Sequence, residues 1–486
     1  MNIPDHILDI ARQLHSAGHA AYAVGGCVRD ILMGKEPKDW DITTAARPEE
    51  ILQVFPNGKY ENTFGTVMLP IYTASAEENG HKSKPSSIVE ITTYRSEQGY
   101  SDRRHPDEVS FETELDKDLE RRDFTINALA FNPLEPETII DYFGGRKDIK
   151  AKIIRSVGEP ADRFKEDALR LLRAVRFSSQ LGFELEPKTQ RGIVKLAGSL
   201  KFVSPERIRD EFVKILSSDR PAEGVTLLHE TKLLQYILPE LEQGVGVKQD
   251  RHHIHTVFKH NLLSLQHCPS REWPVRLAAL LHDVGKPKTR KIIGGIATFY
   301  NHEYVGAKLV ERIMTRLKFS NEDRERVVNL VKNHMFYYNV GEVTAASVRR
   351  LIVKVGRQNL KDLIELRIAD RLGSGTPKAK PYKLRHLEYM MEKVQNDPIS
   401  VKMLKINGDD LMRLLAIAPG PKIGAILDVL LSEVIEEPEH NTLEHLAERA
   451  RKLAELPLEE LRARAREVIE EKREEEDKKI KRQYKV

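Results

Sequence analysis

The sequence predicts an α+β fold in which a small mixed sheet with helices is followed by domains that are entirely helical. Three strand-like runs, HAAYAVGG, KDWDITT and SSIVEITTYR, alternate with helical stretches within residues 1–150. From about residue 151 the apolar residues recur at the i, i+3, i+4 spacing of amphipathic helices. No convincing strand follows, so we expect helices from there to the end of the chain.

Four domains are expected, because 486 residues are too many for a single core. The α+β head is assigned to residues 1–150 and a helical neck to 151–245. Residues 246–375 form a third domain that holds most of the notable histidines, and 376–486 form a helical tail. A polar insert, ASAEENGHKSKPSS, is expected to be the loop of a hairpin between two head strands.

Composition excludes several classes of protein. No apolar run approaches the roughly 18 residues that span a bilayer, and the run MNIPDHILDIARQLHSAGHA predicts an amphipathic helix rather than a secretory signal. Two cysteines, Cys27 and Cys268, offer no disulfide framework and indicate a reducing, cytoplasmic location. The net charge of +4 is compatible with an RNA partner, and no feature indicates an obligate protein partner.

The most informative segment combines a glycine turn with two carboxylates. GGCVRD, residues 25–30, is followed by DWD, residues 39–41. Residues i and i+2 of a strand point to one face, so Asp39 and Asp41 present two hard oxygen ligands that suit Mg²⁺. The glycine turn leaves backbone N–H groups open for a triphosphate, and Arg29 adds positive charge.

A third carboxylate would help to bind the metal beneath an attacking hydroxyl, and Glu90 in IVEITTYR is the candidate. Taken alone, a DxD pair is more often an exposed strand end, and a GG pair is a plain turn. The order of strand, glycine turn, helix, strand with DxD and strand with an acid favours phosphoryl or nucleotidyl transfer.

The run GGCVRDILMGKEPKDWDITT resembles the signature motif of the class II tRNA nucleotidyltransferase and bacterial poly(A) polymerase family. Further runs within residues 20–216 resemble other motifs of this family, in family order: Phe64-Gly65-Thr66, Tyr100-Ser101-Asp102-Arg103-Arg104, RRDFTINA at 121–128, Asp141-Tyr142-Phe143-Gly144-Gly145 with Asp148, and EDALR at 166–170.

This resemblance implies a polymerase-β-like head and a role for several residues. Asp39 and Asp41 would be the catalytic acids that bind metal, and Arg122 and Asp123 would contact the ribose and phosphates of the incoming nucleotide. The full set of candidate nucleotide-binding residues is Gly25, Gly26, Arg29, Arg122, Asp123, Asn127, Asp167, Arg170, Arg173 and Arg176.

The run EDALR also suggests how a base is chosen. On a helix, Arg170 is an i, i+3 neighbour of Asp167 and an i, i+4 neighbour of Glu166. A surface ion pair is the plain interpretation. Alternatively, a carboxylate accepts from the amino group of cytosine or adenine while a guanidinium donates to the adjacent ring nitrogen, which uracil and guanine do not permit.

The product is expected to be a complete CCA end, added to the 3′ end of tRNA from CTP and ATP with release of pyrophosphate. EDALR followed by LLRAVRF is closer to the tRNA enzymes than to poly(A) polymerases. CC-adding members of the family typically have a shortened loop before the RRDFTxNA motif, whereas YSDRRHPDEV is full length. Addition of A alone remains an open alternative.

A second candidate site lies within residues 252–370. It comprises His260, His282-Asp283 in ALLHDVGK, His302, His334 and Asp370. Mixed imidazole and carboxylate ligands favour Mn, Fe, Ni or Zn over Mg, and His302 with His334 would hold a second ion. Two metals suit phosphoester hydrolysis. His252, His253 and His255 are interpreted as structural or RNA-facing rather than as ligands.

The stretch around His282-Asp283 resembles the HD phosphohydrolase superfamily, which leaves a second hypothesis open. In that hypothesis hydrolysis is the main activity and the head only binds substrate. A non-catalytic RNA-binding protein is disfavoured, because both sites keep complete ligand sets. Residues 406–440 resemble the body and tail of the tRNA enzymes, which implies a grip on the tRNA elbow; a plain helix–helix turn at APGPKIG is the alternative.

Overall fold

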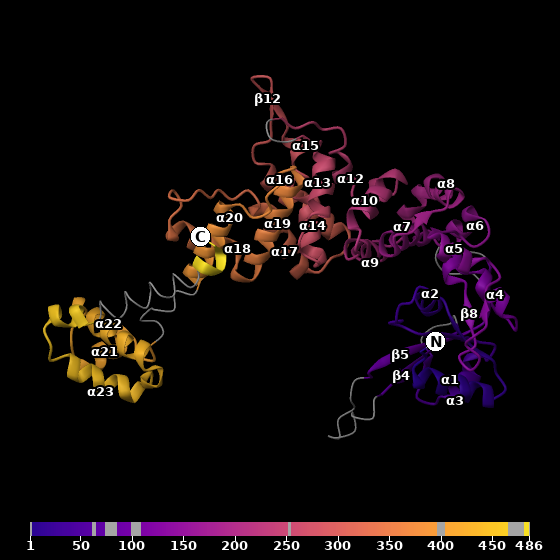
Figure 1. Ribbon diagram of the computed structural model, residues 1–486, viewed down its shortest axis with the longest axis horizontal. Coiled ribbons are helices and arrows are strands. Elements are labelled where there is room, and N and C mark those ends of the chain that lie inside the picture. The colour runs from indigo at the N-terminus through magenta and orange to yellow at the C-terminus, as the bar shows by residue number, and fades with distance from the viewer. Residues whose placement is uncertain are drawn as a thin grey trace. The chain divides into compact units, whose positions relative to one another are not determined.

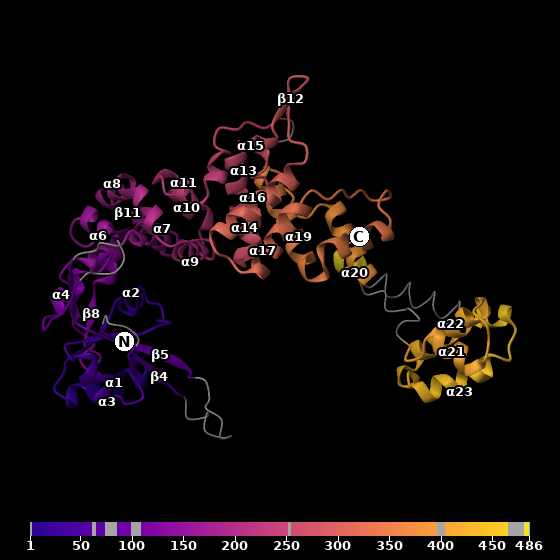
Figure 2. The same cartoon turned by 180° about the vertical axis from the view of Figure 1, so that it is seen from behind.

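The computed structural model describes residues 2–60, 65–72, 85–98, 108–250, 254–395, 404–464 and 481–485. These form two compact units, which are described separately: Met1–His334 with Ile364–Thr376, and Met335–Leu363 with Pro377–Val486 (Figures 1 and 2). Several residues of the predicted motifs lie outside the described ranges: Phe64, most of the insert at 74–87, the loop at 100–104, and His252 and His253.

The head contains the mixed sheet that the sequence predicts. Seven strands lie in the order β3-β4-β5-β2-β1-β8-β9, with β2 parallel to β5 and every other neighbouring pair antiparallel. The strands are β1 (Ala21–Val24), β2 (Asp41–Thr44), β3 (Lys59–Tyr60), β4 (Thr66–Ile71), β5 (Ser87–Thr93), β8 (Ala130–Phe131) and β9 (Ile139–Ile140). A separate antiparallel ribbon joins β6 (Arg95–Gln98) and β7 (Glu108–Phe111).

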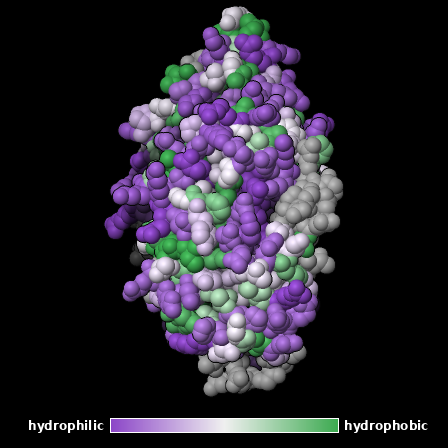
Figure 3. All heavy atoms as spheres, turned by 90° about the vertical axis from the view of Figure 1, so that its right-hand side faces the viewer, coloured by the Kyte–Doolittle hydropathy of each residue, from purple (hydrophilic) through white to green (hydrophobic). Residues whose placement is uncertain are grey.

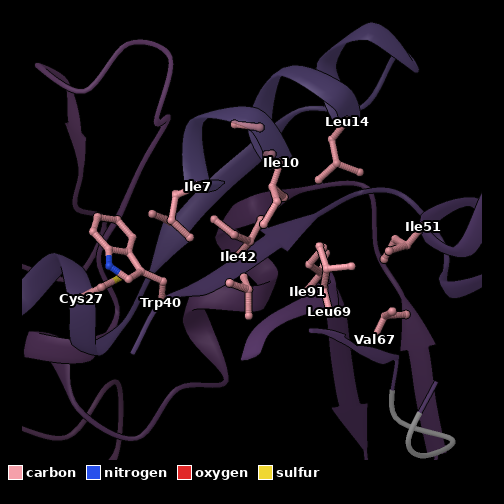
Figure 4. Close-up of a cluster of buried hydrophobic side chains, with 14 of the residues drawn as sticks. Ile7, Ile10, Leu14, Cys27, Trp40, Ile42, Ile51, Val67, Leu69 and Ile91 are labelled. Carbon is pink, nitrogen blue, oxygen red and sulfur yellow. The ribbon is translucent and has the colours of Figure 1, made fainter. Parts of the chain in front are cut away.

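Helices complete the head around an apolar core. They are α1 (Asp5–Ser16), α2 (Gly26–Leu32), α3 (Pro48–Val54), α4 (Leu115–Glu120), the 3₁₀ turn η2 (Thr125–Asn127) and α5 (Gly145–Ala151). The expected amphipathic N-terminal helix is confirmed, since Ile7, Ile10 and Leu14 of α1 are buried against Ile42 and Ile91 of the central strands (Figure 4). This packing fixes the position of β2, the strand that begins with Asp41 of the DxD pair.

The neck is helical, as predicted. Its elements are α6 (Pro160–Glu166), α7 (Leu169–Leu181), α8 (Pro187–Leu196), η3 (Ala197–Phe202), α9 (Pro205–Leu216), α10 (Pro221–Glu230), α11 (Leu234–Ile237) and α12 (Pro239–Glu242). Buried apolar residues of α7 and α9 face one another, so these two helices form the centre of the neck.

The histidine-bearing part of the first unit follows the neck. Its helices are α13 (Val257–Gln266), α14 (Trp273–Leu281), α15 (Lys286–Thr289), α16 (His302–Arg316), α17 (Asn321–Asn333) and α19 (Leu360–Gly373), of which α19 begins in the second unit. The second unit contains α18 (Ala345–Val355), η4 (Arg357–Asn359), α20 (Tyr382–Gln395), α21 (Gly408–Leu415), α22 (Pro421–Glu436), η6 (Pro438–His440) and α23 (Leu443–Leu453).

The prediction that no strand follows residue 151 is wrong in detail. β10 (Ile153–Ile154) pairs in parallel with β11 (Glu184–Leu185), and β12 (Lys291–Ile293) forms a hairpin with β13 (Ile296–Thr298). Gly294 and Gly295 between β12 and β13 have φ values of 58° and 78°. Two consecutive positive-φ residues are the signal of a tight hairpin turn, and this signal was available in the sequence KIIGGIAT.

The surface agrees with the exclusion of a membrane-spanning segment. None of the helices in the described ranges is both long enough and apolar enough to cross a bilayer. On the face drawn in Figure 3, hydrophilic residues predominate and hydrophobic ones form small groups.

Candidate active site and metal cluster

A glycine turn connects β1 to α2 at one edge of the candidate site in the head. Gly25 has φ 78° and ψ −125°, a conformation that L side chains rarely adopt. A Cβ atom at this position would lie 2.8 Å from Nη1 of Arg122 and 3.8 Å from Oδ2 of Asp41. The absence of a side chain at Gly25 therefore lets the RRDFTINA segment approach the DxD acids.

The two acids of DxD flank Trp40, whose side chain is buried in the head core and packs edge-to-face on Phe131 (Figure 4). Because Trp40 points inward, Asp39 and Asp41 point the other way, and Asp39 is exposed while Asp41 is half-buried. Burial raises the pKa of the Asp41 carboxyl; Arg122 opposes this change and Asp39 adds to it.

Glu90 lies on β5 directly opposite Asp41 in the parallel register. Residues paired in this way project from the same face of a sheet, so the structure places the candidate third carboxylate on the side of the DxD pair. Within the described ranges, only groups in the histidine cluster bring three ligand atoms within 4.8 Å of one another; Asp39, Asp41 and Glu90 do not form such a group.

A hydrogen-bonded chain connects the head to the neck. Arg29 Nη1 donates to Asn127 Oδ1 at 2.7 Å, and Asn127 Nδ2 donates to Asp123 Oδ1 at 3.2 Å. Asp123 Oδ2 accepts from Arg173 of α7 at 2.6–2.7 Å. Burial alone would raise the pKa of Asp123, but the guanidinium groups of Arg173 and Arg170 hold this pKa at about 2.

The expected helix through EDALR is interrupted, which corrects the predicted spacing. α6 ends at Glu166, and Asp167 adopts an extended conformation with φ −132° and ψ 109°. The predicted Glu166–Arg170 contact is present at 2.6 Å, whereas Asp167 pairs with Arg207 of α9 at 2.7 Å. Asp167 Oδ1 accepts from the backbone N–H of Leu169, which is why the chain turns at this position.

Two residues of α9 support the neck site and were missed in the sequence. Arg207 holds Asp167, and Glu211 pairs with Arg176 at 3.1 Å in the interior. The signal was present, because Arg207 and Glu211 are i, i+4 neighbours in SPERIRDEF and therefore lie on one helix face. Phe177 was also missed; its ring lies 4.1–5.4 Å from the guanidinium carbons of Arg29, Arg173 and Arg176.

The six predicted residues of the second site come together in the first unit. His260 Nε2 lies 3.0 Å from His282 Nε2, 3.3 Å from Asp283 Oδ2 and 3.3 Å from Asp370 Oδ1. The other carboxylate oxygen, Asp283 Oδ1, lies 3.1 Å from His302 Nε2 and 3.8 Å from His334 Nε2. Asp283 thus belongs to both groups of three ligands.

Three of these histidines present the same ring nitrogen to the cluster. The Nδ1 atoms of His282, His302 and His334 each lie 2.7–2.9 Å from a backbone carbonyl oxygen three residues earlier. A carbonyl oxygen only accepts, so Nδ1 carries a hydrogen in each ring, and Nε2 of a ring in its neutral state keeps a lone pair. This arrangement fits a metal centre, because it fixes the tautomer that ligates through Nε2.

Residues around the cluster set its charge. Lys286 Nζ lies 2.6 Å from Asp283 Oδ2 and donates to Gln249 Oε1 at 2.7 Å, and Arg367 pairs with Asp370 at 2.8 Å. Burial alone would raise the pKa of Asp283, but the neighbouring positive charges of Lys286 and His282 outweigh burial and hold this pKa well below its usual value. Burial is the main cause that lowers the pKa of His334 to about 3, and the charge of His282 adds to it, so the ring of His334 is neutral.

The sheet and its glycine turn, with two carboxylates on the adjoining strand, define the head of a nucleotidyltransferase. Residues 21–155 match the Poly A polymerase head domain, 182–244 match the RNA and SrmB-binding site of polymerase A, and 296–450 match tRNA nucleotidyltransferase domain 2. The chain is 33% identical to a CCA-adding enzyme of Lactiplantibacillus plantarum over 92% of this chain and 95% of that one. It is 37% identical to an A-adding tRNA nucleotidyltransferase of Deinococcus radiodurans over 67% of this chain and 76% of that one.

Among solved structures, the Bacillus stearothermophilus CCA-adding enzyme in complex with CTP covers 93% of this chain and 99% of its own, with 28% identity and a TM-score of 0.60. The chain belongs to the tRNA nucleotidyltransferase family that includes the CCA-adding enzymes, so the predicted family is confirmed. Enzymes of this family use a divalent metal ion, typically Mg²⁺.

Proposed function

We propose that this enzyme adds C, C and A to the tRNA 3′ end from CTP and ATP. The supporting observation is its relationship to a CCA-adding enzyme along nearly its whole length, whereas its relationship to an A-adding enzyme covers two thirds. Addition of A alone is the second candidate, because the identity in that shorter region is higher, at 37%. The tRNA and nucleotide substrates favour a cytoplasmic location.

In this proposal the head binds the triphosphate and the metal. Asp39 and Asp41 hold Mg²⁺, with Glu90 as a third carboxylate, and the N–H groups of the Gly25-Gly26 turn meet the phosphates at the N-terminus of α2. Bound Mg²⁺ would stabilise the charge that develops on the attacking and leaving oxygens. The tRNA 3′ oxygen attacks the α-phosphorus of the nucleotide, and the bond to the pyrophosphate oxygen breaks.

The neck chooses the base. Arg170 is held by Glu166 and by the backbone carbonyl of Arg121, and Asp167 is held by Arg207. Both side chains are held in place before a base arrives, so they can offer an acceptor and a donor to cytosine or adenine without reorganisation. Arg122, Asp123 and Asn127 are proposed to bind ribose and phosphates, with Arg173 and Arg176 supporting them.

Product formation tests this proposal directly. Three transcripts of one tRNA, ending before, within and after CC, are incubated with CTP alone, ATP alone, or both. A CCA-adding enzyme extends all three to the same CCA end. Extension of only the transcript that ends in CC, with ATP, would establish the A-adding alternative, and long A tails would establish a poly(A) polymerase.

A second, hydrolytic activity is proposed for the histidine cluster. His260, His282, Asp283 and Asp370 would hold one transition-metal ion (Mn, Ni, Fe or Zn), and His302, His334 and Asp283 a second. His260 Nε2 and His282 Nε2 lie 3.0 Å apart and both face the carboxylates of Asp283 and Asp370, and this convergence of ring nitrogens and carboxylates supports metal binding by His260 and His282. Bound metal would supply a hydroxide nucleophile for phosphoester hydrolysis.

Metal content and hydrolysis separate this activity from nucleotide addition. His282→Ala should lose transition metal, measured by mass spectrometry of the purified protein, and should lose hydrolysis of bis(p-nitrophenyl) phosphate. His267→Ala, which alters an exposed histidine at the C-terminal end of α13 outside the cluster, serves as the control. Equal metal content in both variants would contradict the assignment of His282 as a metal ligand. CCA addition is expected to survive in both variants.

The remaining domain roles follow from these sites. Residues 1–150 form the catalytic head, 151–245 the neck that reads the base, 246–375 the metal-binding domain, and 376–486 a tail that binds tRNA. The turn at APGPKIG opens α22, a helix of 16 residues, and Lys422 is a half-buried residue of its first turn. This arrangement is compatible with a phosphate contact on the tRNA elbow.

A further inference from the structure

A cavity of about 790 Å³ lies in the head, away from the residues assigned to catalysis. Its lining comes from the start of β1, the ends of β2, β5 and β9, and α4. The glycine turn follows the other end of β1, and the DxD acids lie at the start of β2, whose first residue is Asp41. Since a strand of four residues spans about 13 Å, the cavity is separated from the catalytic acids by the length of these strands.

Aromatic rings form much of the cavity wall. Tyr22, Tyr94, Tyr142 and Phe143 line it, and Tyr142 is 58% exposed while it meets the Phe143 ring edge-to-face at 6.4 Å between centroids. Tyr22 and Phe143 also pack on a small apolar cluster that includes Tyr94. The tyrosines therefore offer ring faces at the solvent side and a firm apolar floor beneath them.

Carboxylates form the rest of the polar rim. Glu114, Asp116 and Glu120 line the cavity with a single cation, Lys117, which lies 3.5 Å from Glu120. Among the residues that the structure describes, neither Glu114 nor Asp116 has an ion-pair partner within 4.0 Å. This negative charge disfavours nucleotides and RNA phosphates, so a ligand here is not another copy of the catalytic substrates.

The hydroxyl of Tyr94 is the independent sign that something is bound. Tyr94 is 3% exposed, and its hydroxyl has no hydrogen-bond partner in the described part of the chain. A buried hydroxyl without a partner is unfavourable, so native proteins usually satisfy it. A ligand N–H in the cavity would donate to this oxygen.

We propose that this cavity binds an organic cation of the ammonium or guanidinium type. Ring faces attract such cations, the free carboxylates of Glu114 and Asp116 neutralise them, and the Tyr94 oxygen accepts a hydrogen bond from their N–H groups. The source is either a free polyamine or a basic side chain of a partner peptide. This site is independent of the nucleotidyl transfer and hydrolysis proposed above.

The position of the cavity gives a ligand a route to the catalytic head. α4 carries Glu114 and Asp116 at its beginning and ends at Arg121. Asp118 on the same helix is fully buried and pairs with Arg121 at 2.7 Å and with Arg122 at 3.4 Å. A cation bound at the start of α4 therefore contacts the helix that holds Arg122 beside Gly25.

Calorimetric titration of the full chain at low salt, in a buffer free of amines, tests the proposal. The probes are spermidine and the peptide acetyl-Gly-Arg-Gly-amide; whichever binds more tightly identifies the source. Tyr142→Ala removes one ring and Glu114→Gln removes one carboxylate, and each variant should bind the probe about fivefold more weakly than the wild type. Matched controls in the head are Tyr72→Ala, which removes a tyrosine that is 53% exposed, and Glu49→Gln.

Both test residues lie at the surface, and thermal unfolding confirms that each variant folds. If Tyr142→Ala unfolds, Glu114→Gln alone decides the question. The proposal is overturned if neither probe binds the wild type at millimolar concentration. It is equally overturned if the control variants weaken binding as much as the test variants, because the cation would then be held elsewhere by general charge.

Discussion

The two candidate metal sites of this enzyme differ in how completely the protein encloses them. In the head, Asp39 is exposed and Asp41 is half-buried. In the histidine cluster, His260, His282, Asp283 and His334 are at most 2% exposed. The exposure of Asp39 would leave room for ligands that a nucleotide brings, whereas the histidine cluster would itself supply nearly every ligand to a bound ion. A metal site that its substrate completes can therefore be open to solvent, whereas a site for a permanently bound ion can be enclosed by the protein core.

The two sites also use glycine for different reasons. Gly25 provides a positive φ beside the flexible side chain of Arg122. Gly285 has an ordinary φ of −78°, but a Cβ there would lie 2.2 Å from the backbone oxygen of His302. Substitution is therefore opposed by the backbone conformation at Gly25 and by a clash with the backbone of α16 at Gly285.

The largest effect is expected from Asp39→Ala in the head. Nucleotide addition should fall by about a thousandfold in kcat/KM, because stabilisation of several kcal/mol of transition-state charge is lost. Measured addition to a tRNA ending in CC provides the test. Metal content of the histidine cluster should not change, and addition within tenfold of wild type would contradict the proposed role of Asp39.

The next effect is expected from Gly285→Ala, which should lower the free energy of unfolding by about 2–3 kcal/mol through a backbone clash with α16. Urea denaturation measures this, and transition-metal content should fall with it because His302 is displaced. Gly424→Ala is the control, since a Cβ at Gly424 meets no atom within 4 Å. Full metal content in Gly285→Ala would show that the cluster is less rigid than its packing indicates.

A smaller effect concerns pH and the link between head and neck. The pKa of Asp123 is about 2, below its unfolded value near 4, so its ionised form stabilises the fold above pH 4 and this contribution disappears as pH falls toward 2. The free-energy difference between wild type and Asp123→Asn should be about 2 kcal/mol at pH 6 and should shrink at low pH. Asp162→Asn, which alters an exposed pair with Lys165, should show no such trend.

The smallest effect is expected from Arg207→Ala, which leaves every base-reading residue in place. Without Arg207 the Asp167 carboxylate loses its orientation, so the ratio of kcat/KM for CTP over UTP should fall by about tenfold. Arg191→Ala, an exposed arginine of the neck, is the control. Unchanged discrimination together with a lower melting temperature would assign Arg207 a purely structural role.

Most of the head could be predicted because its signals are local. Alternation around Trp40 identified the strand and the face of both acids, and the glycine pair identified a turn before a helix. Other features depended on residues distant in sequence. The partner of Asp167 is Arg207, 40 residues away, and the helix break at Asp167 could not be inferred from a spacing that fits a continuous helix equally well.

The sequence by itself determined the fold class, the family and most of the candidate residues of both sites, because periodicity and motif spacing are properties of short segments. Only the tertiary structure decided which oxygen of Asp283 faces which histidines, that Glu90 stands opposite Asp41, and that Arg122 reaches Gly25. These arrangements depend on the packing of strands and helices far apart along the chain. No local pattern of residue types records distance between such segments.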